Sequence, residues 1–268
     1  MSTNAGNINQ VAGSSSSAES NFSASKLLLA PFLKTALPFM AMLTLLAFAT
    51  LYYQGWAAWA HGLDATTAEF EKYWMNLFYA ETVIIWGVAL SAWTWLWVTR
   101  DRNAASGSIT PTEEVRRYMV WIGIIACYVL ALYYAASFFA EQDASWHQAV
   151  VRDTAFTPTH IVLFYGWFPI FIGFGGAMFF YAMTRLPVYA KRLSLMVTVA
   201  VLGPFMVLPN VAFNEWGHAF WISEEIFSLP LHWGFVVFGW AALAFGGLLV
   251  QILNRLMEIV PQAANEGS

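Results

Sequence analysis

Residues 118–139 read YMVWIGIIACYVLALYYAASFF, a stretch in which no side chain is charged. A helix needs about 20 consecutive apolar residues to cross the hydrocarbon core of a bilayer. The apolar residues are continuous here, whereas a strand of a membrane β-barrel would alternate apolar and polar residues. This stretch therefore predicts a transmembrane α-helix.

Five other stretches of similar character lie on either side of it. We place the six predicted spans at residues 36–56, 73–98, 118–139, 160–183, 193–213 and 231–253. The whole chain of 268 residues is 59% hydrophobic and only 10% charged, which is too apolar for an ordinary soluble domain. The sequence thus predicts an all-α integral membrane protein with about six transmembrane helices in a bundle.

The two ends of the chain differ from this bundle. We divide the sequence into an N-terminal segment, 1–34, that is disordered or interfacial, a transmembrane helical domain, 35–255, and a C-terminal tail, 256–268. The residues through Ser25 are rich in Ser, Asn, Ala and Gly, so their composition gives no reason to expect order. A cleaved signal peptide is not expected, because the first apolar run has full membrane length and lacks an obvious cleavage site.

Basic residues favour one orientation of the bundle. They are concentrated at the N-terminus, the second and fourth loops and the C-terminus: Lys26, Lys34, Arg100, Arg102, Arg116, Arg117, Arg185, Lys191, Arg192 and Arg255. The first and third loops hold only Lys72 and Arg152. By the positive-inside rule, both termini are predicted to be cytoplasmic. The outer loops are acidic, which favours cations and argues against nucleic acid as a partner.

Four of the five histidines belong to two similar motifs. These are Asp143-x3-His147-x12-His160 and Asn214-x3-His218-x13-His232. Each motif starts after one predicted span and ends at the beginning of the next, so both motifs are expected on the same, outer side. The repetition favours a functional role. A single histidine such as His61 is better interpreted as a hydrogen-bonded residue at the membrane interface.

The spacing within each motif suits a metal ion. Residues four apart lie on one face of a helix, with Cβ atoms about 5 to 6 Å apart. The third donor follows a proline by two residues, Pro158 before His160 and Pro230 before His232, and proline favours the start of a helix. Two imidazoles and one oxygen donor suit copper, zinc or non-haem iron better than magnesium or calcium. The motif with the charged carboxylate is expected to hold a divalent ion more tightly.

Some residues inside the spans need their own interpretation. Glu81 lies about eight residues into the second span, where an ionised carboxylate is costly, so it is expected to be paired, protonated or part of a proton path. Cys127 is expected to be a buried, inert thiol. The glycine-rich string at 173–176 is typical of close helix packing rather than phosphate binding. The many tryptophans, Trp121 and Trp146 among them, are expected to form mostly an interfacial belt.

Several stretches resemble the C subunit of the copper membrane monooxygenases, the family of particulate methane monooxygenase and ammonia monooxygenase. They are EQDASWHQAVVRD at 141–153, FTPTH at 156–160, TRLP at 184–187, GPFMVLPN at 203–210, NEWGHAF at 214–220 and PLHWGFVVFGW at 230–240. The resemblance extends from about His61 to the end of the sixth predicted span and is not expected in the first forty residues.

The resemblance implies a subunit that assembles with A and B subunits into a trimer of heterotrimers. It implies a bacterial inner or intracytoplasmic membrane, with the metal sites toward the periplasm. It implies copper, with zinc or iron as alternative occupants, at two sites: Asp143, His147 and His160, and Asn214, His218 and His232. All six positions carry the residue types of the family pattern. No catalytic residue is assigned, because the B subunit has copper of its own.

The reaction implied by the resemblance inserts one oxygen atom of O2 into a small substrate, while the other atom leaves as water. Methane oxidation to methanol is favoured by the stretch FEKYWMN at 70–76, and ammonia oxidation to hydroxylamine comes next. Short alkanes stay open as substrates. Electrons are expected from quinol. Two other functions also remain open: a non-haem iron oxygenase, because two histidines and one carboxylate can bind iron as well, and a non-catalytic scaffold or metal-delivery subunit.

Overall fold

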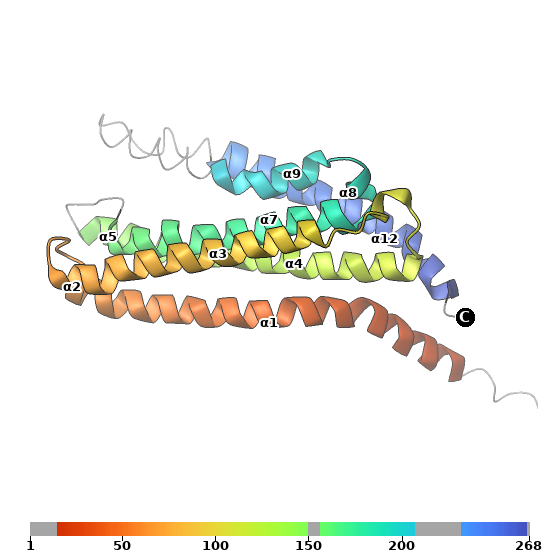
Figure 1. The fold of residues 1–268 in the computed structure, drawn as a ribbon, viewed down its shortest axis with the longest axis horizontal. Helices are drawn as coiled ribbons and strands as arrows, with labels where there is room; N and C mark the ends of the chain where they lie inside the picture. The colour runs from red at the N-terminus through yellow and green to blue at the C-terminus, as the bar shows by residue number, and fades with distance from the viewer. Residues whose placement is uncertain (1–14, 150–155, 207–231, 267–268) are drawn as a thin grey trace, which may run out of the picture.

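The described part of the chain is built from helices (Figure 1). This computed structural model describes residues 15–149, 156–206 and 232–266. By length and composition, five helical stretches in these ranges can cross a membrane: Lys26–His61, Ala68–Val98, Pro111–Asp143, Pro158–Arg185 and Gly239–Glu266. The prediction of an all-α membrane protein is confirmed. The remaining predicted span, 193–213, lies partly outside the described residues.

The helices begin and end as follows. The first three spans consist of α1 (Ser15–His61), α2 (Ala68–Phe70), η1 (Glu71–Met75), α3 (Asn76–Val98), α4 (Pro111–Phe138), η3 (Phe139–Asp143) and α5 (Ala144–Ala149). The later elements are α6 (Pro158–His160), η4 (Ile161–Trp167), α7 (Phe168–Arg185), α8 (Pro187–Lys191), α9 (Leu195–Leu202), η5 (Gly203–Met206), η6 (His232–Phe245) and α12 (Gly246–Glu266). The short turn η2 (Ala104–Ser106) lies between α3 and α4.

Helical stretches begin earlier in the chain than predicted, most clearly at two helices. Helix α1 begins at Ser15, within the stretch whose composition gave no reason to expect order. Helix α4 begins at Pro111 rather than at residue 118. Its start is explained by a cap: Thr110 Oγ1 accepts a hydrogen bond from the backbone N–H of Glu113, and Pro111 occupies the first helical position. The prediction counted apolar residues only and so left out this polar first turn.

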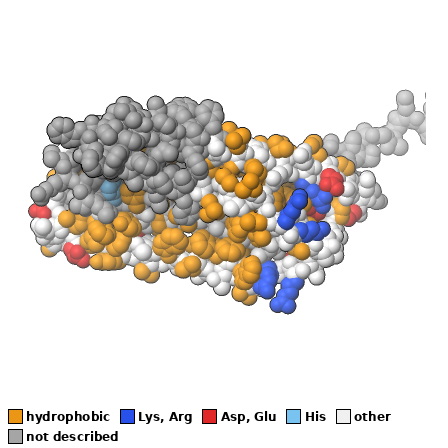
Figure 2. All heavy atoms as spheres, turned by 90° about the horizontal axis from the view of Figure 1, so that it is seen from above, with side chains coloured by type: hydrophobic (Ala, Val, Ile, Leu, Met, Phe, Trp, Pro, Cys, Tyr) orange, Lys and Arg blue, Asp and Glu red, His pale blue; other side chains and the backbone are white. Residues whose placement is uncertain are grey.

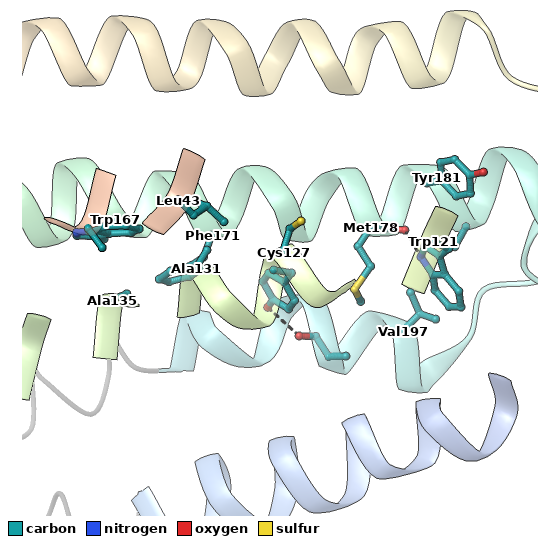
Figure 3. Packing of buried hydrophobic residues seen from close by; sticks show 14 of the residues in the cluster. Leu43, Trp121, Cys127, Ala131, Ala135, Trp167, Phe171, Met178, Tyr181 and Val197 are labelled. Atoms are coloured by element: carbon teal, nitrogen blue, oxygen red, sulfur yellow. Dashed lines mark hydrogen bonds between the residues drawn. The ribbon is translucent and has the colours of Figure 1, made fainter. Parts of the chain in front are cut away.

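Helix α4 lies at the centre of the bundle, where it packs against α1, α7 and α12. Two of its aromatic side chains donate hydrogen bonds to backbone carbonyls of other helices (Figure 3). Trp121 Nε1 donates to Met178 O of α7 at 2.9 Å, and Tyr128 Oη donates to Ala200 O of α9 at 2.9 Å. Both side chains are fully buried. The interfacial interpretation of Trp121 is therefore wrong, because its indole faces the helix contact and has found an acceptor there.

Trp146 is also buried rather than interfacial. The predicted burial of Cys127 and the interpretation of the glycine-rich string are confirmed. Cys127 is buried, and its thiol lies 3.7 Å from Ala36 O of α1. A Cβ atom on Gly175 would lie 3.1 Å from the ring of Tyr128, and one on Gly176 would overlap the ring of Trp93. The glycines of 173–176 thus allow α7 to approach α3 and α4 closely.

The bundle has two chemically different ends. We name one end of the bundle the histidine end. It contains His61, where α1 ends, together with Asp143 and His160. We call the arginine end the opposite one, where α3 and α7 end and α4 begins; there Arg117 Nη1 donates to Arg185 O at 2.9 Å. Figure 2 shows the Lys and Arg side chains gathered toward one end of the molecule and a histidine toward the other. The cytoplasmic position of the termini stays a prediction.

Candidate metal centre

The structure brings together the first and the last residue of the first histidine motif. Asp143 is the last residue of η3, and His160 is the last residue of α6. Asp143 Oδ1 lies 3.4 Å from His160 Nε2, and the side chain of Asp143 is 5% exposed. The two residues are far apart in sequence, so their approach is a result of the packing of η3 against α6.

This separation can be tested against a bound ion. Nitrogen and oxygen ligands lie about 2.0–2.2 Å from a transition-metal ion such as zinc, which puts two ligands at a tetrahedral angle about 3.3–3.6 Å apart. The observed 3.4 Å between Asp143 Oδ1 and His160 Nε2 falls in that range. It is longer than a good hydrogen bond of about 2.7–3.2 Å. The pair is therefore compatible with a shared ion.

Thr159 supports the carboxylate. Its hydroxyl donates a hydrogen bond to Asp143 Oδ1 at 2.6 Å, and the residue is fully buried. A ligating carboxylate is usually held by such a neighbour, which sets its orientation. Thr159 was not among the site residues predicted from the sequence. The available signal was its position in FTPTH, directly before His160.

Close packing at the helix ends positions His160. Pro158 is the first residue of α6, as the sequence predicted. A Cβ atom on Gly62 would lie only 2.6 Å from the Cγ atom of Pro158. Because glycine has no Cβ atom, the end of α1 can contact the start of α6. The imidazole of His160 packs edge-on against Phe164 with ring centroids 5.0 Å apart. The first turn of this span is therefore held between α1 and η4.

The remaining predicted ligands are described only in part. His147 lies in α5, one turn after Asp143, but its side chain is outside the described residues. Helix α5 itself is anchored by Trp146, whose ring lies 5.1 Å from that of Trp59 in α1. Asn214 and His218 lie outside the described residues, and His232 is described only as the first backbone position of η6. Within the described residues, no group of three His, Cys, Asp or Glu side chains comes together.

His61 does not join the site. Its ring stacks on Tyr73 at 4.3 Å with the planes 16° apart, and it meets Trp56 edge-on. In the loop that follows, hydrogen bonds from Thr66 hold the pKa of the exposed Asp64 below its ordinary value. This carboxylate contributes to the acidic character of the histidine end.

The interior of the histidine end contains polar atoms without a partner. In the described part of the chain, buried side-chain atoms that make no hydrogen bond belong to Gln54, Trp74, Glu81, Thr82, Trp146 and Trp167. All six residues lie in the half of the bundle that ends at the histidines. Glu81 Oε2 lies 3.0 Å from the position that a Cβ atom on Gly166 of η4 would occupy. No cationic side chain of the described residues pairs with Glu81.

The backbone near the site is also unusual. All four π-helical segments of the described chain, η1, η3, η4 and η6, lie in the histidine half. A π-helical turn inserts an extra residue, shifts the register of the side chains that follow, and is frequent at functional sites. Three of these segments adjoin the proposed ligands, since η3 ends at Asp143, η4 follows His160 directly and η6 begins at His232.

Fold and site together define a multi-pass helical membrane protein in which a buried carboxylate lies beside a partly buried imidazole at one end of the bundle. The chain belongs to the family of ammonia monooxygenase/methane monooxygenase C subunits, whose model matches residues 14–263. The protein is therefore a subunit of a membrane monooxygenase. The match also covers most of the first forty residues, so the expectation that they carry no resemblance was wrong. No curated protein sequence matches the chain.

Proposed function

We propose that this subunit binds copper at Asp143, His147 and His160 and contributes the site to a monooxygenase that oxidises a small gaseous substrate. The observation that carries the proposal is the approach of Asp143 Oδ1 to His160 Nε2 at 3.4 Å in a buried position. A buried carboxylate is costly unless it is paired or coordinates a metal. Imidazole and carboxylate donors in this combination suit a transition metal.

Each residue has a distinct role in this proposal. Asp143 supplies negative charge in a region with little solvent, and Thr159 fixes that carboxylate through its hydroxyl. His160 presents Nε2 from the first turn of its span, where Pro158 and the end of α1 restrict its movement. Three protein donors leave coordination positions open, and bound copper would supply the activation of O2. Burial of the Asp143 side chain keeps bulk water away from this carboxylate.

The second motif extends the proposal to Asn214, His218 and His232. Its neutral amide replaces the carboxylate, so this site is proposed to hold a divalent ion less tightly than the first. The complete enzyme is proposed to contain A and B subunits in a trimer of heterotrimers, with the metal sites toward the periplasm of a bacterial inner or intracytoplasmic membrane. Quinol is the proposed electron donor. Methane is the favoured substrate, followed by ammonia and short alkanes.

The test compares the metal content and turnover of the complete complex, purified without chelator, among single variants. His160→Ala and Asp143→Ala are expected to lose the copper bound at the first site, together with turnover. His61→Ala is the matched control, because His61 lies at the same end but stacks on Tyr73. It is expected to keep both metal and activity.

Two outcomes would contradict the proposed copper site or its role, and a third would contradict the proposed substrate. Recovery of activity on adding iron but not copper would identify a non-haem iron enzyme. Full turnover with intact assembly in His147→Ala and His218→Ala would identify a scaffold or metal-delivery subunit. Turnover of ammonia or a short alkane in preference to methane would correct the substrate and leave the metal site in place.

A further inference from the structure

The arginine end contains a pocket that the metal site does not explain. It has a volume of about 340 Å³, within the range of about 300–1,000 Å³ that is typical of small-molecule sites. It lies where α3 and α7 end and α4 begins. The pocket is lined by Thr99, Asp101, Glu113, Arg116, Arg117, Val120, Tyr181 and Arg185.

The charges that line the pocket do not cancel. Glu113 pairs with Arg116 at 2.6 Å and with Arg117 at 2.8 Å, and Arg117 also pairs with Asp101 at 2.8 Å. Arg185 forms no ion pair with any carboxylate of the described chain. Three guanidinium groups thus face two carboxylates, which leaves one positive charge without compensation in the pocket.

The carboxylate of Asp101 in the lining of the pocket stays ionised. Partial burial acts to raise the pKa of Asp101. The hydrogen bonds from Arg117 and from the backbone N–H of Asn103, together with the charges of Arg117 and Arg185, outweigh it and hold this pKa below its ordinary value. The ion pairs of Arg116 and Arg117 are therefore already formed at neutral pH. The positive charge that remains without compensation in the pocket is that of Arg185.

Neutral groups hold Arg185 in place. Its Nη1 donates to Leu96 O at 3.0 Å, and its Nη2 donates to Thr99 Oγ1 at 2.6 Å. Its guanidinium also lies over the rings of Trp95 and Tyr181, 5.6 and 5.5 Å from their centroids. An arginine fixed in this way loses little conformational entropy when it binds an anion.

Each arginine of the pocket keeps a donor for such an anion. Within the described residues, Nε of Arg185, Nη1 of Arg116 and Nη2 of Arg117 have no hydrogen-bond acceptor. The N–H groups of a guanidinium recognise phosphate oxygens through charge-assisted hydrogen bonds. The chemistry of the pocket therefore points to a phosphate group.

The position of the pocket indicates where the phosphate comes from. Trp95 and Trp97 at the end of α3 are 61% and 52% exposed, and the neighbouring Val98 is 69% exposed. Exposed tryptophans at the end of an apolar helix mark the level of the lipid headgroups. Figure 2 shows the Lys and Arg side chains beside hydrophobic surface at this end of the molecule. Basic pockets between transmembrane helices are known to bind anionic headgroups.

We propose that the arginine pocket binds the phosphate of an anionic phospholipid headgroup, with Arg185 and Arg116 as its principal ligands. The acyl chains of that lipid lie along the exposed apolar surface of α3. Arg185 supplies the charge, and Arg116, whose side chain is 52% exposed, closes the site from the solvent side.

The test measures lipid that stays bound to the complete complex. The complex is placed in nanodiscs of phosphatidylcholine with a minor fraction of phosphatidylglycerol, extracted again in mild detergent, and its bound lipids are quantified by mass spectrometry. Arg185→Gln and Arg116→Gln are compared with Arg100→Gln. Arg100 is the matched control, because it lies at the same end, stacks on Trp97 and does not line the pocket.

Arg185→Gln is expected to lower the ratio of bound phosphatidylglycerol to phosphatidylcholine about tenfold, the effect of losing one charge-assisted contact. Arg116→Gln is expected to act in the same direction, and Arg100→Gln is expected to leave the ratio unchanged. Arg116→Gln also keeps the test decisive if Arg185→Gln does not fold, since the side chain of Arg116 bonds only to Glu113 within the described residues.

Two results would overturn the proposal. The first is an unchanged lipid ratio in an assembled Arg116→Gln or Arg185→Gln complex, which would leave the pocket as an ion-pair network between α3, α4 and α7. The second concerns the source of the phosphate: added inorganic phosphate that displaces phosphatidylglycerol, and binds with the same dependence on Arg185, would identify a free anion as the ligand.

Discussion

The two ends of this bundle treat buried polar groups in opposite ways. At the arginine end, Glu114 is almost fully buried and both of its oxygens accept hydrogen bonds from Arg255 at 2.8 Å. At the histidine end, six residues of the described chain keep buried polar atoms without a partner. All π-helical segments of the described chain also lie in that half.

This difference separates stability from function. A buried polar group costs free energy unless it is hydrogen-bonded, so a fold selected only for stability would satisfy these groups within the chain. The arginine end does so through ion pairs between the ends of its helices. The histidine end leaves groups for a metal ion, another subunit or water to satisfy, which fits its proposed role as the site of chemistry in an enzyme of several subunits.

The largest effect on stability is expected from Glu114→Ala. This change leaves Arg255 without its buried partner and should lower the free energy of unfolding by about 3 kcal/mol, toward the lower end for a broken buried pair because Arg255 is partly exposed. Glu258→Ala is the control. Glu258 also pairs with Arg255 but is 58% exposed, so its loss should cost less than about 1 kcal/mol.

The rate at which Cys127 becomes accessible to a maleimide measures this stability, because Cys127 is the only cysteine of the chain and is buried. Mass spectrometry of its peptide distinguishes it from cysteines of other subunits. If Glu114→Ala and Glu258→Ala changed the labelling rate equally, the stability of the arginine end would not depend on the buried pair of Glu114 and Arg255.

At the histidine end, Thr159→Val should weaken the metal site. The variant keeps the shape of the side chain but removes the hydroxyl that donates to Asp143, and loss of such a supporting contact typically lowers metal affinity or activity about 10- to 100-fold. Thr159→Ser keeps the hydroxyl and should retain most of the affinity. Copper content and turnover, measured on the same sample, check this. Unchanged copper in Thr159→Val would argue against Asp143 as a ligand.

Two tryptophans allow the two halves to be compared directly. The indole of Trp121 donates to Met178 O, whereas that of Trp167 is buried and has no acceptor within the described residues. Replacing each with Phe removes similar volume, so Trp121→Phe should cost about 1 kcal/mol more than Trp167→Phe. The labelling rate of Cys127 provides the measurement. A larger cost at Trp167 would mean that another subunit or a lipid supplies its acceptor.

The smallest effect is expected for Glu81→Gln. An amide in a membrane span needs no compensating positive charge, so stability should stay the same or rise by less than about 1 kcal/mol. A clear loss of stability would reveal a cationic partner from another subunit. Turnover of the same variant separates the two remaining interpretations of Glu81: a loss indicates a proton path, and no change indicates a carboxyl group that stays protonated.

Much of the fold was predictable because hydropathy and helix length constrain membrane spans strongly. The predicted spans 36–56, 73–98, 118–139 and 160–183 each fall within a long apolar helical stretch of the described residues. Their starts do not coincide with those of the stretches, because polar caps such as Thr110 before Pro111 set the first turn and contribute nothing to an apolar count. Burial within the bundle was also not predictable for Trp121, since a tryptophan in the aromatic belt and one in the core have the same sequence context.

For the candidate site, the sequence predicted which residue types belong together, and the structure tested one pair of them. Asp143 and His160 meet, while His147, Asn214, His218 and His232 stay predictions. The role of Thr159 was not predicted. Its hydroxyl supports Asp143 only because it points toward that carboxylate, and the sequence does not give the direction of a side chain.

The amino-acid sequence by itself determined the class of the protein, the approximate positions of four spans and the motifs that carry its histidines, because these depend on the polarity of residues and their spacing along one chain. Only the tertiary structure decided that Asp143 reaches His160, that Glu114 pairs with Arg255 and that Arg185 keeps an uncompensated charge. Each of these depends on the rotation and register of one helix against another. Helix packing sets that register through close contacts such as that of Gly62 with Pro158, which no local pattern in the sequence records.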